Sequence, residues 1–593
     1  MLLTEKNKII KYTEIVIILL SAAFIFYRAP YGYSFYDEPF IVTLGQRLYK
    51  GDLLLSDEWH VTQMIAPVML FFYQIFHIFS ETNDGILLSF RYIYCVLHFL
   101  TCFTVYSVLR KKYRFSIIPF IYIILFSPYD YMSLSYKSIG LMCCLLIASL
   151  VYNGGIGKNR AGTAVAFSLL WCLLVMCCPY MAIAYILYLI AVFAAACKKK
   201  RSSEIFLEPS FALLSFGIVG IVSIVYLLLF VFREKTELNT IIQSIKYIFD
   251  DPEHQQTFFE KIKWLLFSMF FKCRFYSRCL IISLGLCLLK NKPRSLRLVI
   301  FGISAVGFCY AIIEIISSLT ALTTYYEMID IVMLGLVAFL LLKDKPWRML
   351  LSFTNIGILY TVFQIVASNN GLFEFDLSVV PMGVSGIVFI FLFIEEILDE
   401  IKTESVSASG LKNNGNSIVR STNRQKTIEK SLCFLCVILV LGLQLTAQLK
   451  VRMTRQFWDD LFPNLTETIS VGAAKGLITT PENKKEYEKT YNISKTIKDS
   501  AEKGTNCKKF ASFVLEPVIY LDVDMEFATF SAWTYQPKER DTMLKRFDQY
   551  YSLHPNCIPD AVFTDSITDL PEHIDIDRYS ITKVDNNFLM VKH

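Results

Sequence analysis

The chain has 593 residues, of which 54% are apolar and only 19% are charged, and its formal net charge is +6. Together with a mean hydropathy of +0.46, this composition excludes an ordinary soluble domain and predicts a protein that crosses a membrane many times. The expected partners include membrane lipid, and no nucleic acid is expected among them.

Apolar runs of about 17 to 25 residues can cross the roughly 30 Å hydrocarbon layer as helices, and about thirteen runs meet this criterion. The first is expected to be a retained helix, since Arg28-Ala29-Pro30 and a polar loop follow it without a cleavage site. The third, fourth and fifth are short, which indicates that their outer ends line a cavity. The expected spans are residues 9–29, 85–109, 115–129, 138–152, 163–178, 180–197, 210–232, 264–289, 297–319, 326–342, 349–367, 378–397 and 431–449.

Clusters of Lys and Arg predict the orientation of the spans, because short loops that carry them stay in the cytoplasm. One cluster precedes the first span and others follow every second span. The N terminus is therefore expected inside, and the C-terminal segment outside, the cytoplasmic (plasma) membrane. The chain divides into a transmembrane region, a flexible cytoplasmic linker, a last span and an extracytoplasmic domain. Their ranges are residues 1–402, 403–430, 431–449 and 450–593.

The first external loop, residues 30–84, is long and rich in charged and aromatic side chains. Apolar residues recur at helical spacing in 40–49 and in 64–79, which predicts two amphipathic helices along the membrane surface. These helices would frame a groove at the interface. The acidic loop Tyr36-Asp37-Glu38-Pro39 follows the first span, and Asp37 and Glu38 are its candidate catalytic residues. Glu38 can bind a metal, contact the acceptor or cap the helix.

Asp37, and Asp130 of the next external loop, are candidates for chemistry because a carboxylate at a membrane boundary is costly unless solvated, paired or cation-bound. One carboxylate can accept the proton of an attacking hydroxyl as a general base. Two can hold a divalent metal such as Mg, Mn or Ca that balances a phosphate leaving group. Alternatively, Asp37 and Glu38 cap the helix that begins near Pro39, since acids and Pro are favoured in a first turn. Both readings can hold at once.

Other polar residues of the external loops are candidate substrate contacts, and each has a structural alternative. His60 can be a metal ligand, a proton shuttle or an interfacial residue. Arg47 and Lys137 can neutralise a lipid phosphate or only extend to the interface with their charged ends. The paired Asn residues can bind sugar hydroxyls or simply form a turn. The candidates are Arg47, His60, Asp130, Lys137, Tyr325, Asn369 and Asn370.

Residues 450–593 predict a small α/β domain, large enough for its own core, in which apolar strand-like runs alternate with charged helical stretches. The strand-like runs are Phe510 to Ile519 and Ala561 to Thr564, and the helical stretches are 482–503 and 537–549. Of the cysteines, only Cys507 and Cys557 fall in this segment. They can pair in an oxidising exterior or remain free.

A first helix, an acidic dipeptide, a long first external loop with interfacial helices and a second acidic loop resemble the GT-C superfamily of membrane glycosyltransferases. The resemblance implies inverting sugar transfer from a polyprenyl-phosphate donor, with Asp37 as base. The Asp37-Glu38 pair is similar to that of the protein mannosyltransferase and aminoarabinose transferase branches. Asp130 matches a second-loop acid that some branches use for a metal or for the acceptor. Stretches similar to uncharacterised bacterial members are 133–137, 367–371, 473–480, 528–531 and 558–562, and Lys137 stands where many relatives have Asn.

The expected fold is thus an all-α polytopic membrane bundle, GT-C-like, with a small C-terminal α/β domain. The expected enzyme is an inverting glycosyltransferase of the EC 2.4 class that modifies a cell-surface glycan, lipid or protein. The alternative is a transporter or flippase for the same lipid-linked sugars. Transporters tend to have internal repeats, which this sequence lacks, and charges in mid-membrane, where Glu314 stands.

Overall fold

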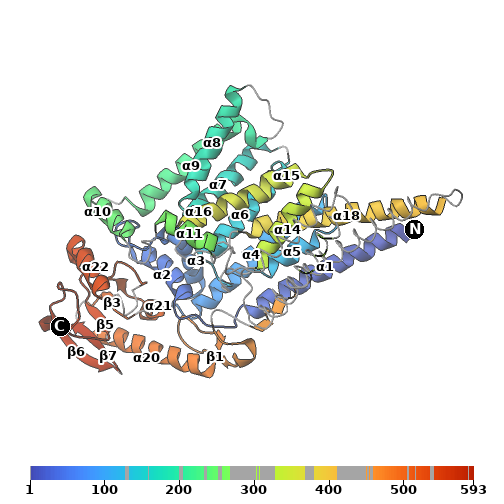
Figure 1. Cartoon of the computed structure of the whole chain (residues 1–593). Coiled ribbons are helices and arrows are strands. Elements are labelled where there is room, and N and C mark those ends of the chain that lie inside the picture. Colours follow the sequence, from blue (N-terminus) through green and yellow to red (C-terminus); the bar gives the residue numbers. More distant parts are fainter. Residues whose placement is uncertain are drawn as a thin grey trace.

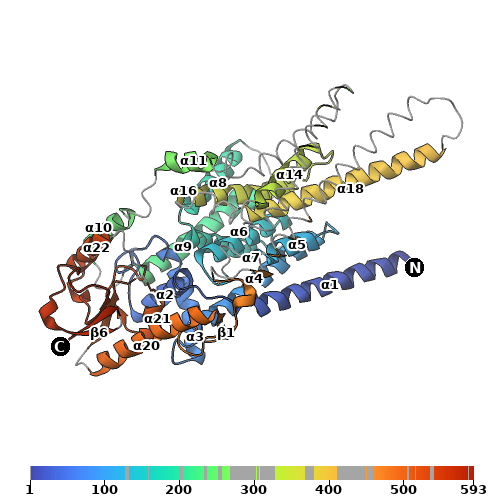
Figure 2. The ribbon, with the colours of Figure 1, turned by 60° about the horizontal axis from the view of Figure 1, so that its bottom comes forward.

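In a computed structural model of the whole chain, a long bundle of helices carries an α/β unit at one end. The N terminus lies at the opposite end (Figures 1 and 2). The structure describes residues 2–126, 132–157, 159–198, 205–232, 237–250, 257–267, 327–367, 379–410, 459–503, 507–514, 516–533, 540–584 and 586–593, with a few single positions between 295 and 306 and between 442 and 454.

The bundle is built from helices of very different lengths. They are α1 (Leu2–Arg28), α2 (Asp37–Lys50), α3 (Ala66–Phe79), α4 (Ile86–Arg110), α5 (Ile117–Ile124), α6 (Tyr136–Asn153), α7 (Arg160–Cys177), α8 (Met181–Cys197), α9 (Pro209–Phe230), α10 (Leu238–Phe249), α11 (Phe258–Phe267), α14 (Glu327–Leu341), α15 (Trp347–Met349), α16 (Asn355–Ala367) and α18 (Val380–Gly410). A π-helical turn, Leu350–Thr354, joins α15 to α16. The chain is therefore mostly helical.

Among the described residues, seven helices are long and apolar enough to cross a membrane. They are α1, α4, α6, α7, α9, the continuous run from α15 to α16, and α18, and each coincides with an expected span. The expected spans at 115–129, 180–197 and 326–342 contain shorter helices, α5, α8 and α14. Those at 264–289, 297–319 and 431–449 lie almost wholly outside the described residues. The chain is a polytopic membrane protein.

The basic end of α4 contacts two other helices on one side of the bundle. Arg110, at the end of α4, forms an ion pair of 3.0 Å with Glu14 of α1. The next residue, Lys111, donates a 3.0 Å hydrogen bond to Asn153 at the end of α6. The first loop and the α/β unit lie at the other end of these helices (Figure 2). Which side is cytoplasmic stays a prediction.

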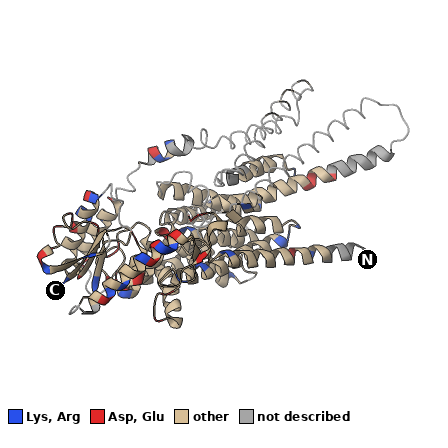
Figure 3. Cartoon of the chain, turned by 90° about the horizontal axis from the view of Figure 1, so that it is seen from below, with Lys and Arg blue, Asp and Glu red and all other residues tan. Residues whose placement is uncertain are grey.

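Charged residues are unevenly distributed between the two parts (Figure 3). The spans are almost free of Lys, Arg, Asp and Glu, whereas α20 (Pro481–Lys503) in the C-terminal unit carries both signs along its length. This contrast is what a lipid-facing bundle and a water-facing unit require.

A mixed sheet with the strand order β4-β3-β5-β7-β6 forms the C-terminal unit. Its strands are β3 (Lys509–Ser512), β4 (Glu526–Phe527), β5 (Ala561–Thr564), β6 (Tyr579–Val584) and β7 (Asn587–Lys592). β3 is parallel to β4 and β5, and β7 is antiparallel to β5 and β6. A separate short ladder pairs β1 (Glu467–Thr468) with β2 (Ile478–Thr479).

Side chains alternate between the two faces of this sheet, so each face packs on a different helix. Phe510, Phe563 and Leu589 share one apolar cluster with Tyr487 and Ile497 of α20. Their strand neighbours share the other cluster with α22 (Arg540–Leu553), namely Ala511, Val562 and Met590 with Phe547 and Tyr551. All four residues of β5 are buried, as expected for a central strand covered on both faces.

The predicted α/β pattern is present, with one difference in extent. The strand expected over Phe510 to Ile519 ends at Ser512, and α21 (Val518–Val523) follows Pro517. Pro favours a helix start, which the apolar run alone did not reveal. Cys507 and Cys557 are both free thiols in the structure.

The first loop is fastened to the C-terminal unit by a buried aromatic residue, Trp59. Its backbone N–H donates to Phe530 O at 2.8 Å, and its indole donates to Ser56 O at 2.9 Å. The ring lies against those of Tyr247, Phe530 and Tyr550. Trp59 is 0% exposed, so it belongs to the core of the C-terminal unit although it lies far away in sequence.

Backbone hydrogen bonds also join the bundle to the C-terminal unit. Gly32 N–H donates to Ile478 O, and Ile478 N–H donates to Pro30 O, at 2.7 and 2.8 Å. Leu87 N–H likewise donates to Ala473 O at 3.2 Å. The loop after α1 and the start of α4 are therefore both tied to the C-terminal unit.

We predict that Trp59→Ala destabilises the attachment of the C-terminal unit. Truncating a fully buried Trp typically costs about 3 to 5 kcal/mol, because it leaves a cavity. The variant should show a lower melting temperature and faster proteolysis within the C-terminal unit. Trp347→Ala, at a position 57% exposed, is the matched control and should leave both unchanged. Equal effects of the two substitutions would contradict this account.

Candidate functional site

The candidate site is built on α2, which begins at Asp37. Nearly all of this helix is buried, from Glu38 to Leu48. It lies directly against the backbone of α3, because a Cβ at Gly45 would stand 2.8 Å from the carbonyl carbon of Met69. The two helices expected in the first loop are therefore present and pack closely on each other.

Glu38 is held by Arg91 of α4 in a two-pronged ion pair. Arg91 Nε lies 2.8 Å from Oε1 and Nη2 lies 2.6 Å from Oε2, and both side chains are at most 1% exposed. Arg91 Nη1 also donates to the carbonyls of Ala29 and Gly32, at 3.0 and 2.8 Å. One guanidinium thus fixes the end of α1, the acidic loop and the start of α2.

Asp37, in contrast, is exposed in the first turn of α2. A carboxylate there is favoured by the unpaired N–H groups and the dipole of the helix, by about 0.3 to 1 kcal/mol. The helix start has no side-chain capping hydrogen bond, so Asp37 favours the helix only through its charge in the first turn. Its neighbour Glu38, with both oxygens on Arg91, is built into the support of that turn.

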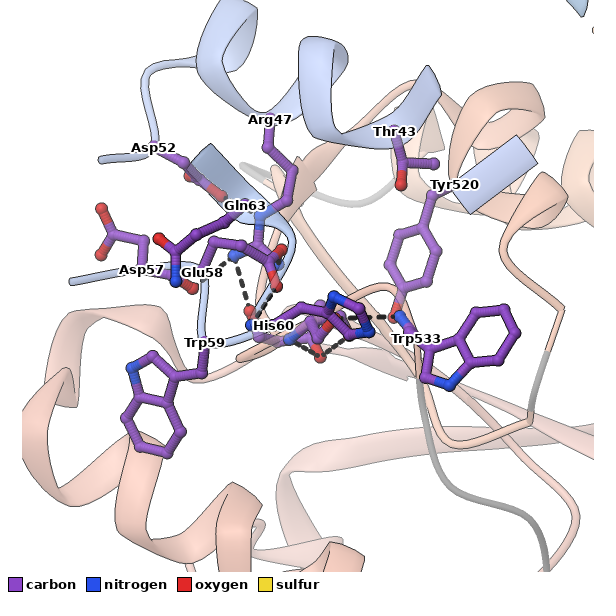
Figure 4. Close-up of polar contacts among 12 residues, drawn as sticks. Thr43, Arg47, Asp52, Asp57, Glu58, Trp59, His60, Gln63, Tyr520 and Trp533 are labelled. Carbon is purple, nitrogen blue, oxygen red and sulfur yellow. Dashed lines mark hydrogen bonds and ion pairs between the residues drawn. The ribbon is translucent and has the colours of Figure 1, made fainter. Parts of the chain in front are cut away.

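The ring of His60 lies 4.6 Å from that of Phe40, which stands about one helical turn after Asp37 in α2. Its Nδ1 accepts from the Thr62 backbone N–H at 3.2 Å and lies 2.7 Å from the Thr62 hydroxyl. In the neutral imidazole the proton therefore sits on Nε2. Figure 4 shows His60 between Glu58 and Trp533.

Arg47 occupies the other part of α2, ten residues and about 15 Å along the helix from Asp37. It is 1% exposed and pairs with Asp52 at 2.7 Å and with Glu58 at 2.9 Å. Its Nη2 also donates to Thr529 O at 2.7 Å, within the C-terminal unit (Figure 4). The structure thus separates Arg47 from Asp37 and surrounds it with protein partners.

The group around Arg47 is rich in carboxylates. Burial raises the pKa of Asp52 to about 7, although the guanidinium of Arg47 opposes the shift. Burial also raises the pKa of Glu58. His554 of the C-terminal unit lies 3.5 Å from Asp57, and burial lowers its pKa. Three carboxylates thus face one guanidinium where the loop meets the C-terminal unit.

The C-terminal unit brings two carboxyl groups near the Asp37 loop that the sequence did not indicate. Burial, and then the charges of Glu516 and Glu486, raise the pKa of Tyr36. Burial raises the pKa of Glu516 itself, although the Thr490 hydroxyl donates to it at 3.0 Å. No local pattern could have revealed this proximity, because it depends on how α20 and α21 dock.

The remaining predicted site residues fall into two groups. Lys137 is half-buried in the first turn of α6, beside the ring of Tyr136 at 5.4 Å. Its helix starts with a capping box between Ser135 and Ser138. The others lie outside the described residues, so their roles stay predictions. They are Asp130, Tyr325, Asn369 and Asn370.

A metal site is not formed by the residues that the structure describes, since no three His, Cys, Asp or Glu side chains among them group suitably. The expected metal pair joins Asp37 to Asp130, and only the first is described. We therefore derive no step through a metal.

Arg28, at the end of α1, was not among the predicted site residues. It lies 4.2 Å from the ring of Phe462 and lines a small cavity with Tyr94 and His98 of α4. The cavity has about 10 Å³ of free space, which is room for about one water molecule. The signal that finds both Arg28 and Arg91 is a cation at the boundary of an apolar run.

No protein-family model and no curated protein matches the chain. Among solved structures it is similar to the oligosaccharyltransferase AglB of Archaeoglobus fulgidus, in complex with an inhibitory peptide and a dolichol-phosphate. The identity is 11% and the TM-score 0.46, over 98% of this chain and 74% of AglB.

The chain is also similar to ArnT from Cupriavidus metallidurans. The identity to the apo state is 10% and the TM-score 0.49, over 97% of both chains. For ArnT bound to undecaprenyl phosphate the values are 11% and 0.46, over 99% of this chain and 98% of ArnT. These neighbours belong to the GT-C superfamily, which the sequence also resembles. Because the identities and TM-scores are low, the likeness carries no argument about substrate or site residues.

We predict that Arg91→Met strongly destabilises the protein. It leaves the Glu38 carboxylate buried without its cation, and breaking a buried pair typically costs about 3 to 5 kcal/mol. Glu38→Gln should cost less, because its amide oxygen can still accept from Arg91. The exposed pair Arg578–Asp575 provides the control, and Arg578→Met should leave the melting temperature unchanged. A melting temperature of Arg91→Met equal to that of wild type would contradict a stabilising role of the Arg91–Glu38 ion pair.

A second prediction concerns Asp522, which accepts from the Ala473 N–H at 2.7 Å and from the Tyr487 hydroxyl. Burial raises its pKa to about 7 from 3.8. Its contribution to stability is therefore present below about pH 4 and lost as the pH rises through about 7. Asp522→Asn should gain stability relative to wild type above about pH 7 and lose that advantage in acid. Melting temperatures across this range test it, with exposed Asp577→Asn as control.

Proposed function

We propose that the chain is an inverting GT-C-type glycosyltransferase that moves a sugar from a polyprenyl-phosphate donor to a cell-surface glycan, lipid or protein. The observation that carries this proposal is the contrast between two adjacent acids at the membrane boundary. Asp37 is exposed at the start of α2, while Glu38 beside it is locked to buried Arg91. A solvent-accessible carboxylate on a rigid support is what a general base requires.

In the proposed reaction the Asp37 carboxylate accepts the proton of an acceptor hydroxyl. The hydroxyl oxygen then forms a bond to the anomeric carbon of the sugar, on the face opposite to the phosphate. The bond from that carbon to the phosphate oxygen breaks, and its electron pair leaves with the polyprenyl phosphate. Asp37 afterwards returns its proton to water.

Three cations are assigned different roles in this proposal. Arg91 acts through Glu38 as a positioning residue, since it fixes the turn that presents Asp37. Lys137, half-buried in the first turn of α6, is assigned to the charge of the phosphate. Arg47 is assigned to the docking of the C-terminal unit, because its partners are protein groups far along α2.

The proposed topology has about thirteen spans, the N terminus inside and residues 450–593 outside. Two features support it. The basic end of α4 lies on one side of the bundle, and the first loop and the C-terminal unit lie on the other. This arrangement would give Asp37 access to acceptors at the outer face.

We predict that Asp37→Asn lowers sugar transfer by about 10² to 10⁴-fold, the usual contribution of general base catalysis. The melting temperature should hardly change, because the side chain is exposed. The measurement is transfer from candidate polyprenyl-phosphate sugars by the purified protein in proteoliposomes. Asp541→Asn is the matched control, since Asp541 is also an acid in the first turn of a helix, α22, and should keep full activity.

Equal turnover of Asp37→Asn and wild type would remove the base assignment. Movement of lipid-linked sugars across the bilayer without any transfer would instead favour the flippase. Loss of activity in both Asp37→Asn and Asp541→Asn would point to a general effect of first-turn acids on helix stability.

A further inference from the structure

The sequence pattern did not predict α10, the short helix between the outer end of α9 and α11. One apolar face of it is not covered by the part of the chain that the structure describes. Leu238, Ile242 and Phe249 are 62%, 57% and 75% exposed. At 100° per residue these three positions fall within one narrow stripe, and half-buried Ile245 stands at its edge, packed against the core.

The neighbouring face of α10 is fixed to the rest of the protein. Ile241, Ser244 and Ile248 are buried, and the Ser244 hydroxyl donates to Ser56 O at 3.4 Å. The ring of Tyr247 lies 5.1 Å from that of Trp59. The helix therefore cannot roll its stripe inward without breaking the contacts that bury Trp59.

The stripe continues a surface that already faces lipid. Among the seven described spans, α9 is the least buried, with only 11% of its residues buried in the apolar stretch. Its outer end exposes Leu228, Leu229 and Phe232. Leu54 N–H donates to Phe230 O at the end of α9, and Ser56 O accepts from α10, so one short segment joins both (Figure 1).

We infer that α10 lies in the outer leaflet with its stripe among the acyl chains and glycerol groups of phospholipid. Its occupant is lipid because no charged side chain interrupts the stripe and because the exposed face of α9 leads directly into it. An amphipathic helix of this kind buries its apolar face by roughly 5 to 10 Å at the interface. Through Tyr247 and Ile248, α10 then sets the height of the C-terminal unit above the membrane.

Photo-crosslinking of the full chain in phosphatidylethanolamine and phosphatidylglycerol vesicles tests this inference. p-Benzoyl-phenylalanine is introduced in place of Phe249, and the adducts are identified by mass spectrometry. Leu228 in α9 is the lipid-facing reference, and Ile581, 42% exposed in the C-terminal unit, is the water-facing control. Position 249 should give phospholipid adducts at a yield close to that of 228 and several-fold above that of 581.

Two results would overturn the inference. Labelling of position 249 at the level of 581 would mean that the stripe does not reach the bilayer. A covalent dimer in place of lipid adducts would mean that a second copy of the chain covers it. The outcome is independent of the proposed glycosyl transfer, since Asp37→Asn leaves the stripe intact.

Discussion

Arg91 is a cation buried inside the bundle. Its guanidinium has five N–H donors, so it can bind several partners at once. Its two prongs hold both oxygens of Glu38, and its third nitrogen reaches carbonyls at the end of α1 and in the acidic loop. A charge in this place is stable only when it is fully paired. The start of α2, and therefore the place of Asp37, follows from that requirement.

The far end of α2 is governed by a second buried cation. Arg47 meets Asp52, Glu58 and a carbonyl of the C-terminal unit, while Trp59 inserts its ring into the core of that unit. The first loop thus joins two bodies, the bundle through Arg91 and the α/β unit through Arg47 and Trp59. The C-terminal unit in turn brings Glu516 and Glu486 towards Tyr36, next to the exposed acid.

The same loop explains the position of α10. Trp59 contacts Tyr247, and Ser56 accepts from Ser244, so burial of the loop orients the helix and leaves its apolar stripe outward. The orientation of α10 and the attachment of the C-terminal unit are therefore linked through residues 54–60.

The sequence alone determined the membrane class, seven of the spans, the two helices of the first loop and the α/β pattern near the C terminus, because each depends on hydrophobic period and length. It also pointed to Asp37, since an acid beside an apolar run is conspicuous. It ranked Asp37 above Glu38 through the family resemblance but left the role of Glu38 open, and it could not place Arg47 in a protein interface. Those outcomes depend on which cation each carboxylate meets, and Arg91 stands 53 residues from Glu38. Only the tertiary structure brings such distant charges together, because burial makes pairing obligatory but leaves the choice of partner to the packing.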